Sequence, residues 1–221
     1  DEHTPLITAA ALPYRANAVF KPGAARVGEE TGLLQRVEEL RGISHLQVAR
    51  SLDGMTAWRF DAEPLLRPHE EHPEEVWGCE DPRLTWLPER EEWAIAYTAY
   101  SRRGPLVSLA MTRDFREVRR LGPVMPPEDK DAALFPRRIG GRCALIHRPT
   151  PHAGGAHIWV SYYPDLRPWG DHSLPHPPTA GARWHAGTTC STPPRAATRR
   201  RRPTPPPGAP DRARPTAPPT G

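Results

Sequence analysis

The sequence lacks several features that would assign it to a class at once. It has three cysteines in 221 residues, and Cys79, Cys143 and Cys190 show no close pairing, so they predict neither a disulfide framework nor a zinc knuckle. No apolar run approaches the roughly 18 residues that a membrane helix needs. The N-terminal residues have neither the basic nor the apolar segment of a secretory leader. We therefore expect a cytoplasmic protein without a membrane partner.

Apolar residues are missing from one long segment. Residues 186–221 contain no Val, Leu, Ile, Met, Phe, Trp or Tyr, and they hold ten prolines, seven arginines and a single acid. Such a segment has no apolar surface to offset the entropy of ordering, so we expect it to be disordered. It is either a basic tail for nucleic acid or acidic partners, or the product of a gene translated out of frame. The abrupt change inside a repeat favours the second explanation.

The charge distribution removes the simplest reason to expect a nucleic-acid partner. The chain carries a net charge of +4 and has a pI near 9.2. Residues 186–221 account for +6 of this charge, so residues 1–185 carry −2. The mildly acidic body gives no electrostatic footprint for nucleic acid.

Helical periodicity is also scarce, and what recurs is a strand, a turn and an aromatic residue. The turns contain Asp53, Asp114 and Asp165, which lie 61 and 51 residues apart. Strand openings recur in step with them, each followed by a turn and a second strand. The openings are at residues 20–24, 79–83 and 129–132, and the second strands at residues 32–37, 93–100 and 142–148.

Repeats of roughly 40–50 residues with about four strands each are typical of β-propeller blades. The sequence therefore predicts an all-β fold in which residues 1–185 form about three blades. A fourth opening begins at Trp184-His185 and is cut short by the tail. Because a propeller buries its faces blade against blade in a closed ring, we expect that activity can be lost with the blades that this chain lacks.

Propellers bind ligands in the central channel, which is lined by the first strand of each blade. The openings place Lys21, Asp81, Lys130 and Asp131 there, and the second strands add Arg36, Tyr100, His147 and Arg148. Carboxylates among cations suit acid catalysis on a sugar bond in the presence of an anion.

Each of these side chains also has a structural alternative. Asp81 could cap a turn before Pro82, and Arg36 or Arg148 could pair with Glu38 or Glu80.

The aromatic and histidine side chains are less specific. Trp77 lies in a glycine-containing loop and is the best candidate for stacking on a sugar, whereas Trp86 and Trp93 are expected to pack across a hairpin. His45, His69 and His72 do not show metal-ligand spacing with carboxylates, so no metal site is expected.

Residues 77–83, Trp-Gly-Cys-Glu-Asp-Pro-Arg, resemble the Glu-Asp-Pro-Arg signature of glycoside hydrolase family 130. Ordered stretches between residues 5 and 185 extend the resemblance, which makes it more specific than one short motif. It implies a five-bladed β-propeller that acts as an inverting phosphorylase of β-mannosides.

The resemblance also implies roles for individual residues. Asp81 would be the general acid, Arg36 would contact sugar or phosphate, and Lys130, His147 and Arg148 would hold phosphate. We expect further substrate contacts from Arg50, Trp77, Tyr100 and Asp131. The sequence departs from the family at Lys21, where an Asn is typical.

The implied reaction splits a β-mannoside oligosaccharide with inorganic phosphate, the co-substrate, into α-mannose 1-phosphate and a shortened acceptor, with no cofactor. A hydrolase on the same propeller is an alternative, which would need a second carboxylate, such as Asp131 or Glu80, to activate water. A non-catalytic carbohydrate-binding fragment is another, and a homo-oligomer is left open.

Overall fold

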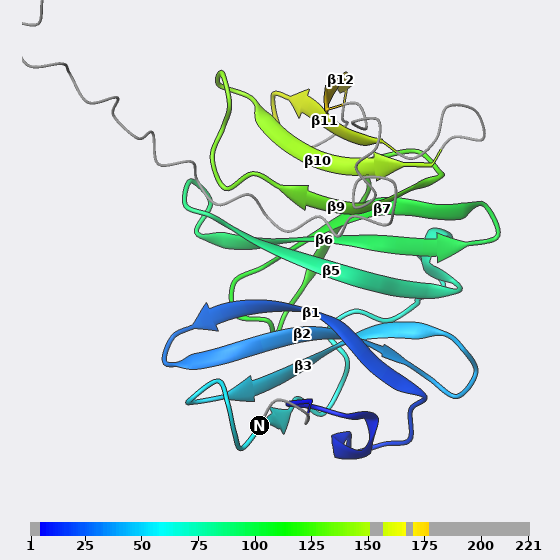
Figure 1. Cartoon of the computed structure of the whole chain (residues 1–221), viewed down its shortest axis with the longest axis vertical. Coiled ribbons are helices and arrows are strands. Elements are labelled where there is room, and N and C mark those ends of the chain that lie inside the picture. Colours follow the sequence, from blue (N-terminus) through cyan, green and yellow to red (C-terminus); the bar gives the residue numbers. More distant parts are fainter. Residues whose placement is uncertain (1–4, 151–156, 167–169, 177–221) are drawn as a thin grey trace, which may run out of the picture.

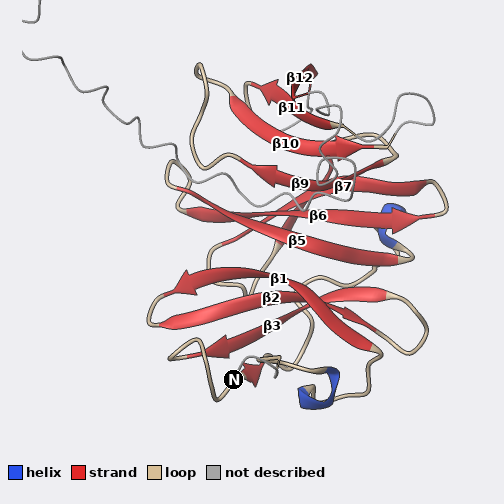
Figure 2. Cartoon of the chain, viewed as in Figure 1, coloured by secondary structure: helices blue, strands red, loops and turns tan. Residues whose placement is uncertain are grey.

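The computed structural model describes residues 5–150, 157–166 and 170–176, the last of these by backbone alone. Within these ranges the chain is built from strands, with two short 3-10 helices, Ala9–Ala11 (η1) and Pro73–Glu75 (η2) (Figure 2). The all-β prediction is confirmed. The predictions for Trp184-His185 and for residues 186–221 lie outside the described residues. No helix among the described residues is long and apolar enough to cross a membrane.

The strands form three consecutive groups of four, arranged one above another along the long axis of the molecule (Figure 1). Neighbouring strands within each group pair antiparallel in chain order. The first group contains β1 (Ala18–Val27), β2 (Glu30–Glu38), β3 (Ser44–Ser51) and β4 (Arg59–Phe60). The second contains β5 (Gly78–Leu87), β6 (Glu92–Ser101), β7 (Gly104–Thr112) and β8 (Arg119–Pro123). The third contains β9 (Asp129–Leu134), β10 (Cys143–Pro149), β11 (Ile158–Tyr163) and β12 (Gly170–His176).

The predicted second strands correspond to β2, β6 and β10. A single parallel bridge, Ser44 with Gly78, joins the first two groups into one sheet, and the third group is a separate sheet.

The middle group is buried on both faces. Alternate residues of a strand point to opposite faces, and in β6 Ile95 and Tyr97 pack into the core shared with the first group. Ala94 and Ala96 pack into the core shared with the third group. Strand β6 therefore shows a run of buried residues rather than a simple alternation.

A bulge interrupts the first strand of each group at the same relative position. The register shifts skip residues 21–22 in β1, 81–82 in β5 and 131–132 in β9. At each bulge one residue other than glycine has a left-handed backbone, with φ of 50° at Lys21, 51° at Asp81 and 55° at Asp131. Bulges re-aim side chains, and these three side chains line one cavity.

Candidate active site

A cavity of about 410 Å³ receives side chains from all three groups of strands. Six of the predicted site residues line it: Arg36, Asp81, Tyr100, Lys130, Asp131 and Arg148. Lys21, Glu80 and Glu128 line it as well. The expected convergence of first-strand openings and second-strand ends therefore agrees with the structure.

Asp81 lies at the centre of the charged groups in this cavity. Its side chain is 8% exposed, with Lys21 Nζ 2.6 Å from Oδ2 and Arg36 Nη1 3.2 Å from Oδ1. Each carboxylate oxygen of Asp81 therefore has its own cation. This arrangement fixes the orientation of the carboxylate toward the cavity, and it differs from the turn cap that the sequence left as an alternative.

Arg36 connects both neighbouring carboxylates. Its Nη2 lies 2.9 Å from Glu80 Oε1, its Nε donates to Ser44 Oγ at 2.9 Å, and its guanidinium lies 4.6 Å from the centre of the Phe20 ring. The pairing with Glu80 that the sequence offered as a structural alternative is present, and it accompanies the contact with Asp81. Arg36 is thus held on three sides, so it is a rigid part of the cavity wall.

Glu80 holds its proton more tightly than a glutamate in water. Burial raises the pKa of Glu80, the neighbouring Asp81 charge raises it further, and Arg36 acts in the opposite direction. The cavity therefore combines an aspartate that is paired with two cations and a neighbouring glutamate whose pKa is raised.

The third group contributes an ion pair, between Arg148 and Asp131, and a lysine, Lys130, that forms no ion pair with a described residue. Arg148 Nε donates to Asp131 Oδ2 at 2.9 Å, and Arg148 Nη2 contacts the same oxygen. Lys130 lies beside them in the cavity wall and makes no ion pair with any described carboxylate. A cation that no carboxylate neutralises is suited to hold an anion.

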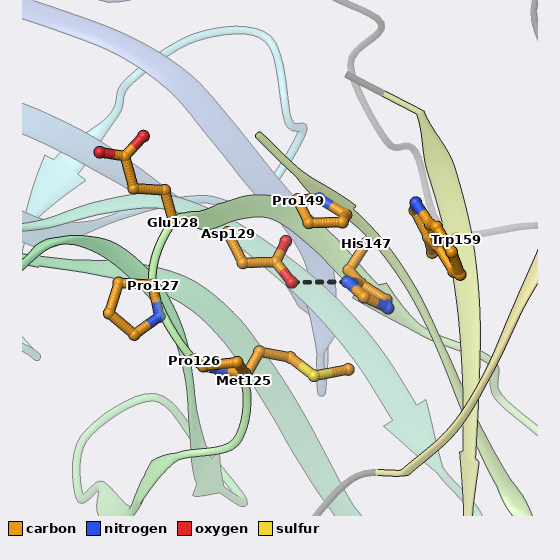
Figure 3. A pocket seen from close by; sticks show the side chains of 8 residues that line it. All are labelled: Met125, Pro126, Pro127, Glu128, Asp129, His147, Pro149 and Trp159. Atoms are coloured by element: carbon orange, nitrogen blue, oxygen red, sulfur yellow. Dashed lines mark hydrogen bonds and ion pairs between the residues drawn. The ribbon is translucent and has the colours of Figure 1, made fainter. Parts of the chain in front are cut away.

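His147 faces away from this cavity. It is buried, with Nδ1 2.5 Å from Asp129 Oδ2 and Nε2 2.7 Å from Ser161 Oγ. It lines a second pocket of about 270 Å³ together with Trp159 (Figure 3). Since neighbouring residues of a strand point to opposite faces, Arg148 reaches the cavity and His147 does not. The structure thus separates His147 from the predicted phosphate ligands.

Arg50 also lies elsewhere, although the sequence predicted a substrate contact. It is buried, with its Nε and Nη2 2.9 and 2.8 Å from the Asp61 carboxylate oxygens. Its Nη2 also donates to the Phe115 carbonyl oxygen at 3.0 Å. Arg50 therefore ties the first group to the turn that follows β7, and it does not line the cavity.

We expect Arg50→Met to lower the free energy of unfolding by about 2 kcal/mol, because it leaves Asp61 and the Phe115 carbonyl without their donor. Urea unfolding followed by circular dichroism measures the change. Arg59→Met is the matched control, since Arg59 is an exposed partner of Glu30 and such pairs contribute about 0–1 kcal/mol. Equal losses in the two variants would contradict the cross-linking role.

Trp77 contacts the site through Tyr100. The two rings meet edge to face with centroids 5.5 Å apart, and Tyr100 lines the cavity. Trp77 is 43% exposed, which leaves its ring accessible to a sugar. Trp86 and Trp93 are register partners with centroids 5.4 Å apart, so their predicted packing across the hairpin is confirmed.

One residue and one cluster were not recognised from the sequence. Glu128 lines the cavity, and the signal that could have revealed it was its position immediately before the strand opening at residues 129–132. Elsewhere, His72, Glu74 and Glu75 bring possible metal-ligand atoms within 4.8 Å of one another. Glu75, however, already accepts hydrogen bonds from Tyr97 Oη at 2.5 Å and from Arg120, so its oxygens are engaged by proton donors.

Comparisons with known proteins point to one family. A family model described as β-1,4-mannooligosaccharide phosphorylase matches residues 8–179. The β-1,2-mannobiose phosphorylase of Listeria innocua is 34% identical over 140 residues, which are 63% of this chain and 38% of that protein. The β-1,4-mannooligosaccharide phosphorylase of Ruminococcus albus is 28% identical over 178 residues, which are 76% of this chain and 52% of that protein.

A solved structure agrees with the sequence comparisons. The Listeria innocua β-1,2-mannobiose phosphorylase in complex with β-1,2-mannobiose superposes with a TM-score of 0.71 at 26% identity, covering 79% of this chain and 65% of that one. The chain spans 38% and 52% of the lengths of the two curated relatives above. Because the family model covers well over half of the chain, the chain belongs to glycoside hydrolase family 130.

Proposed function

We propose that this chain carries the acid and phosphate-binding residues of an inverting β-mannoside phosphorylase. The reaction splits a manno-oligosaccharide with inorganic phosphate into α-mannose 1-phosphate and a shortened acceptor, and needs no further cofactor. The observation that carries this proposal is the cavity in which Asp81 lies among cations, with Lys130 unpaired among the described residues. The names of the relatives support the same chemistry.

We further propose that the three groups of strands are three blades of a five-bladed β-propeller. Each group has four antiparallel strands, and the equivalent bulges aim one side chain per group into the shared cavity. This is how blades place residues around a central channel. The likeness to the solved phosphorylase structure supports the assignment.

In the proposed reaction the protonated carboxyl group of Asp81 donates its proton to the oxygen of the leaving sugar as the bond from that oxygen to the anomeric carbon breaks. The carboxylate that this step leaves is the form that Lys21 and Arg36 pair with in the structure. A phosphate oxygen forms a new bond to the anomeric carbon from the opposite face, which inverts its configuration. Arg36 and Lys21 hold the Asp81 carboxylate in place. Lys130 and Arg148 balance the negative charge of the phosphate and align it with the anomeric carbon before the bond forms.

The contacts favour this reaction over hydrolysis. A hydrolase needs a second carboxylate to activate water, and the two that the sequence offered for this role are engaged, Asp131 with Arg148 and Glu80 with Arg36. The remaining carboxylate of the cavity, Glu128, is exposed, whereas Asp81 is buried. The decisive assay incubates the chain with β-1,2- or β-1,4-mannobiose, with and without phosphate. We expect α-mannose 1-phosphate to form in the presence of phosphate, and equal release of mannose without phosphate would contradict the proposal.

Lys130→Gln should raise the KM for phosphate by about tenfold or more, because it removes a charge-assisted contact to the anion. Initial rates over a phosphate series at fixed mannobiose measure this effect. Arg26→Gln is the control, since Arg26 is exposed and its Nε donates to the Gly28 carbonyl in the β1–β2 turn. An unchanged KM for phosphate in Lys130→Gln would remove Lys130 from the proposed site.

A further inference from the structure

Glu128 lines both the active-site cavity and the second pocket, the one that Trp159 also lines. Its side chain points away from the hydrogen-bonded pair of Asp129 and His147 (Figure 3). Glu128 is exposed, whereas Asp81 is buried, so Glu128 belongs to the solvent-facing rim of the cavity.

Among the described residues, Glu128 is also the cavity carboxylate that has no cation. Glu80, Asp81 and Asp131 each form an ion pair with an arginine or a lysine. The contact recorded for the Glu128 carboxylate is with a neutral group, Thr150 Oγ1, at 3.5 Å from Oε2. Its lone pairs therefore remain available for donors brought by a ligand.

The side chain of Glu128 lies against the start of β7. A Cβ added to Gly104 would lie 3.1 Å from Glu128 Cγ, so the side chain rests directly on the turn between β6 and β7. The backbone is held as well, because the Thr150 amide donates to the Glu128 carbonyl at 2.9 Å.

We propose that Glu128 selects the leaving sugar of the reaction by accepting hydrogen bonds from its hydroxyl groups. This proposal rests on the proposed function. A carboxylate that accepts from a hydroxyl makes a short and strong hydrogen bond, and a sugar ring offers several such donors. The transferred mannose must lie against the buried Asp81, so the sugar at the rim is the one that leaves. The charge of Glu128 disfavours acceptors that carry a carboxylate or a phosphate.

Isothermal titration calorimetry of the full 221-residue chain tests the proposal. The probes are β-1,2-mannobiose without phosphate, so that no turnover occurs, and inorganic phosphate alone. We expect Glu128→Gln to weaken mannobiose binding by about tenfold or more and to leave phosphate binding unchanged or tighter. Glu29→Gln is the matched control, since Glu29 is an exposed glutamate in the β1–β2 turn and does not line the cavity. It should bind both probes like the wild type.

A second comparison tests the selection of neutral acceptors. Binding of mannose and of mannuronate, which carries a carboxylate, is measured in the wild type and in Glu128→Gln. The preference for mannose should fall by about tenfold in the variant, because a like-charge repulsion is removed. The circular dichroism melting curve of the variant shows whether it is folded.

The outcomes separate this proposal from the proposed function. If the wild type binds mannobiose and Glu128→Gln binds it equally well, the role of Glu128 is wrong and the phosphorylase reading stands. Loss of phosphate binding in Glu128→Gln would also overturn the role. A folded wild-type chain that binds neither probe would overturn the proposed function, and the role of Glu128 with it.

Discussion

Asp81→Asn is expected to slow phosphorolysis of β-mannobiose by about a thousandfold, within the range of about 10²–10⁴ that a positioned general acid contributes. The amide keeps the shape of the side chain but has no acidic proton for the leaving oxygen. Binding of mannobiose and phosphate should change much less, because Lys130 and Glu128 are intact. Initial rates of α-mannose 1-phosphate formation and calorimetric affinities measure the two effects.

The nature of the leaving group gives a sharper test of the acid role. The dinitrophenolate of a 2,4-dinitrophenyl β-mannoside leaves without protonation. Asp81→Asn should therefore lose little activity on this substrate. A residue that merely shapes the cavity would slow both substrates equally. Glu80→Gln is the comparison variant, because Glu80 is adjacent, lines the same cavity and has the raised pKa. If Glu80→Gln shows the selective loss and Asp81→Asn does not, the acid is Glu80.

The repeat pattern predicted the strands and the cavity because both follow from turns and strand openings that recur along the sequence. Turn residues and strand openings recur with the three groups of strands, so equivalent positions in each opening meet at one place. Lys21, Asp81 and Asp131 could therefore be grouped from spacing alone. The bulge that gives them a left-handed backbone could not, because it arises from pairing with the second strand.

The sequence placed His147 and Arg50 in the wrong surroundings, because it did not reveal the strand face of the first or the hydrogen-bond partner of the second. His147 and Arg148 are adjacent in one motif, and a pleated strand sends them to opposite sides. Arg50 found its partner Asp61 eleven residues later, in a loop whose path the pattern does not specify. Glu128 was missed because exposed glutamates are common, and what distinguishes it is that among the described residues it has no counter-charge, whereas the other carboxylates of the cavity each have one.

The largest effect on stability should come from Glu75, which is 0% exposed in η2 between the first and second groups. Its carboxylate accepts from Tyr97 Oη at 2.5 Å, from Cys79 Sγ at 3.3 Å and from Arg120 Nε at 3.2 Å. Burial, with Glu75 adding to it, raises the pKa values of the Tyr97 phenol and the Cys79 thiol, so both remain protonated as donors. Glu75 therefore accepts hydrogen bonds from two buried groups, Tyr97 and Cys79, and from the partly buried Arg120.

Glu75→Ala should lower the free energy of unfolding by about 3–5 kcal/mol, because it leaves the Arg120 charge partly buried without its partner. Urea unfolding followed by circular dichroism measures this loss. Glu74→Ala is the control, since Glu74 is the adjacent residue and its partner in the described structure is His72 at 3.5 Å. It should cost about 1 kcal/mol or less.

Glu75→Gln separates the charge from the hydrogen bonds. The amide oxygen can still accept from Tyr97 while the ion pair with Arg120 is lost, so its cost should lie between those of Glu74→Ala and Glu75→Ala. Equal stability of Glu75→Ala and the wild type would show that the cluster contributes nothing to folding.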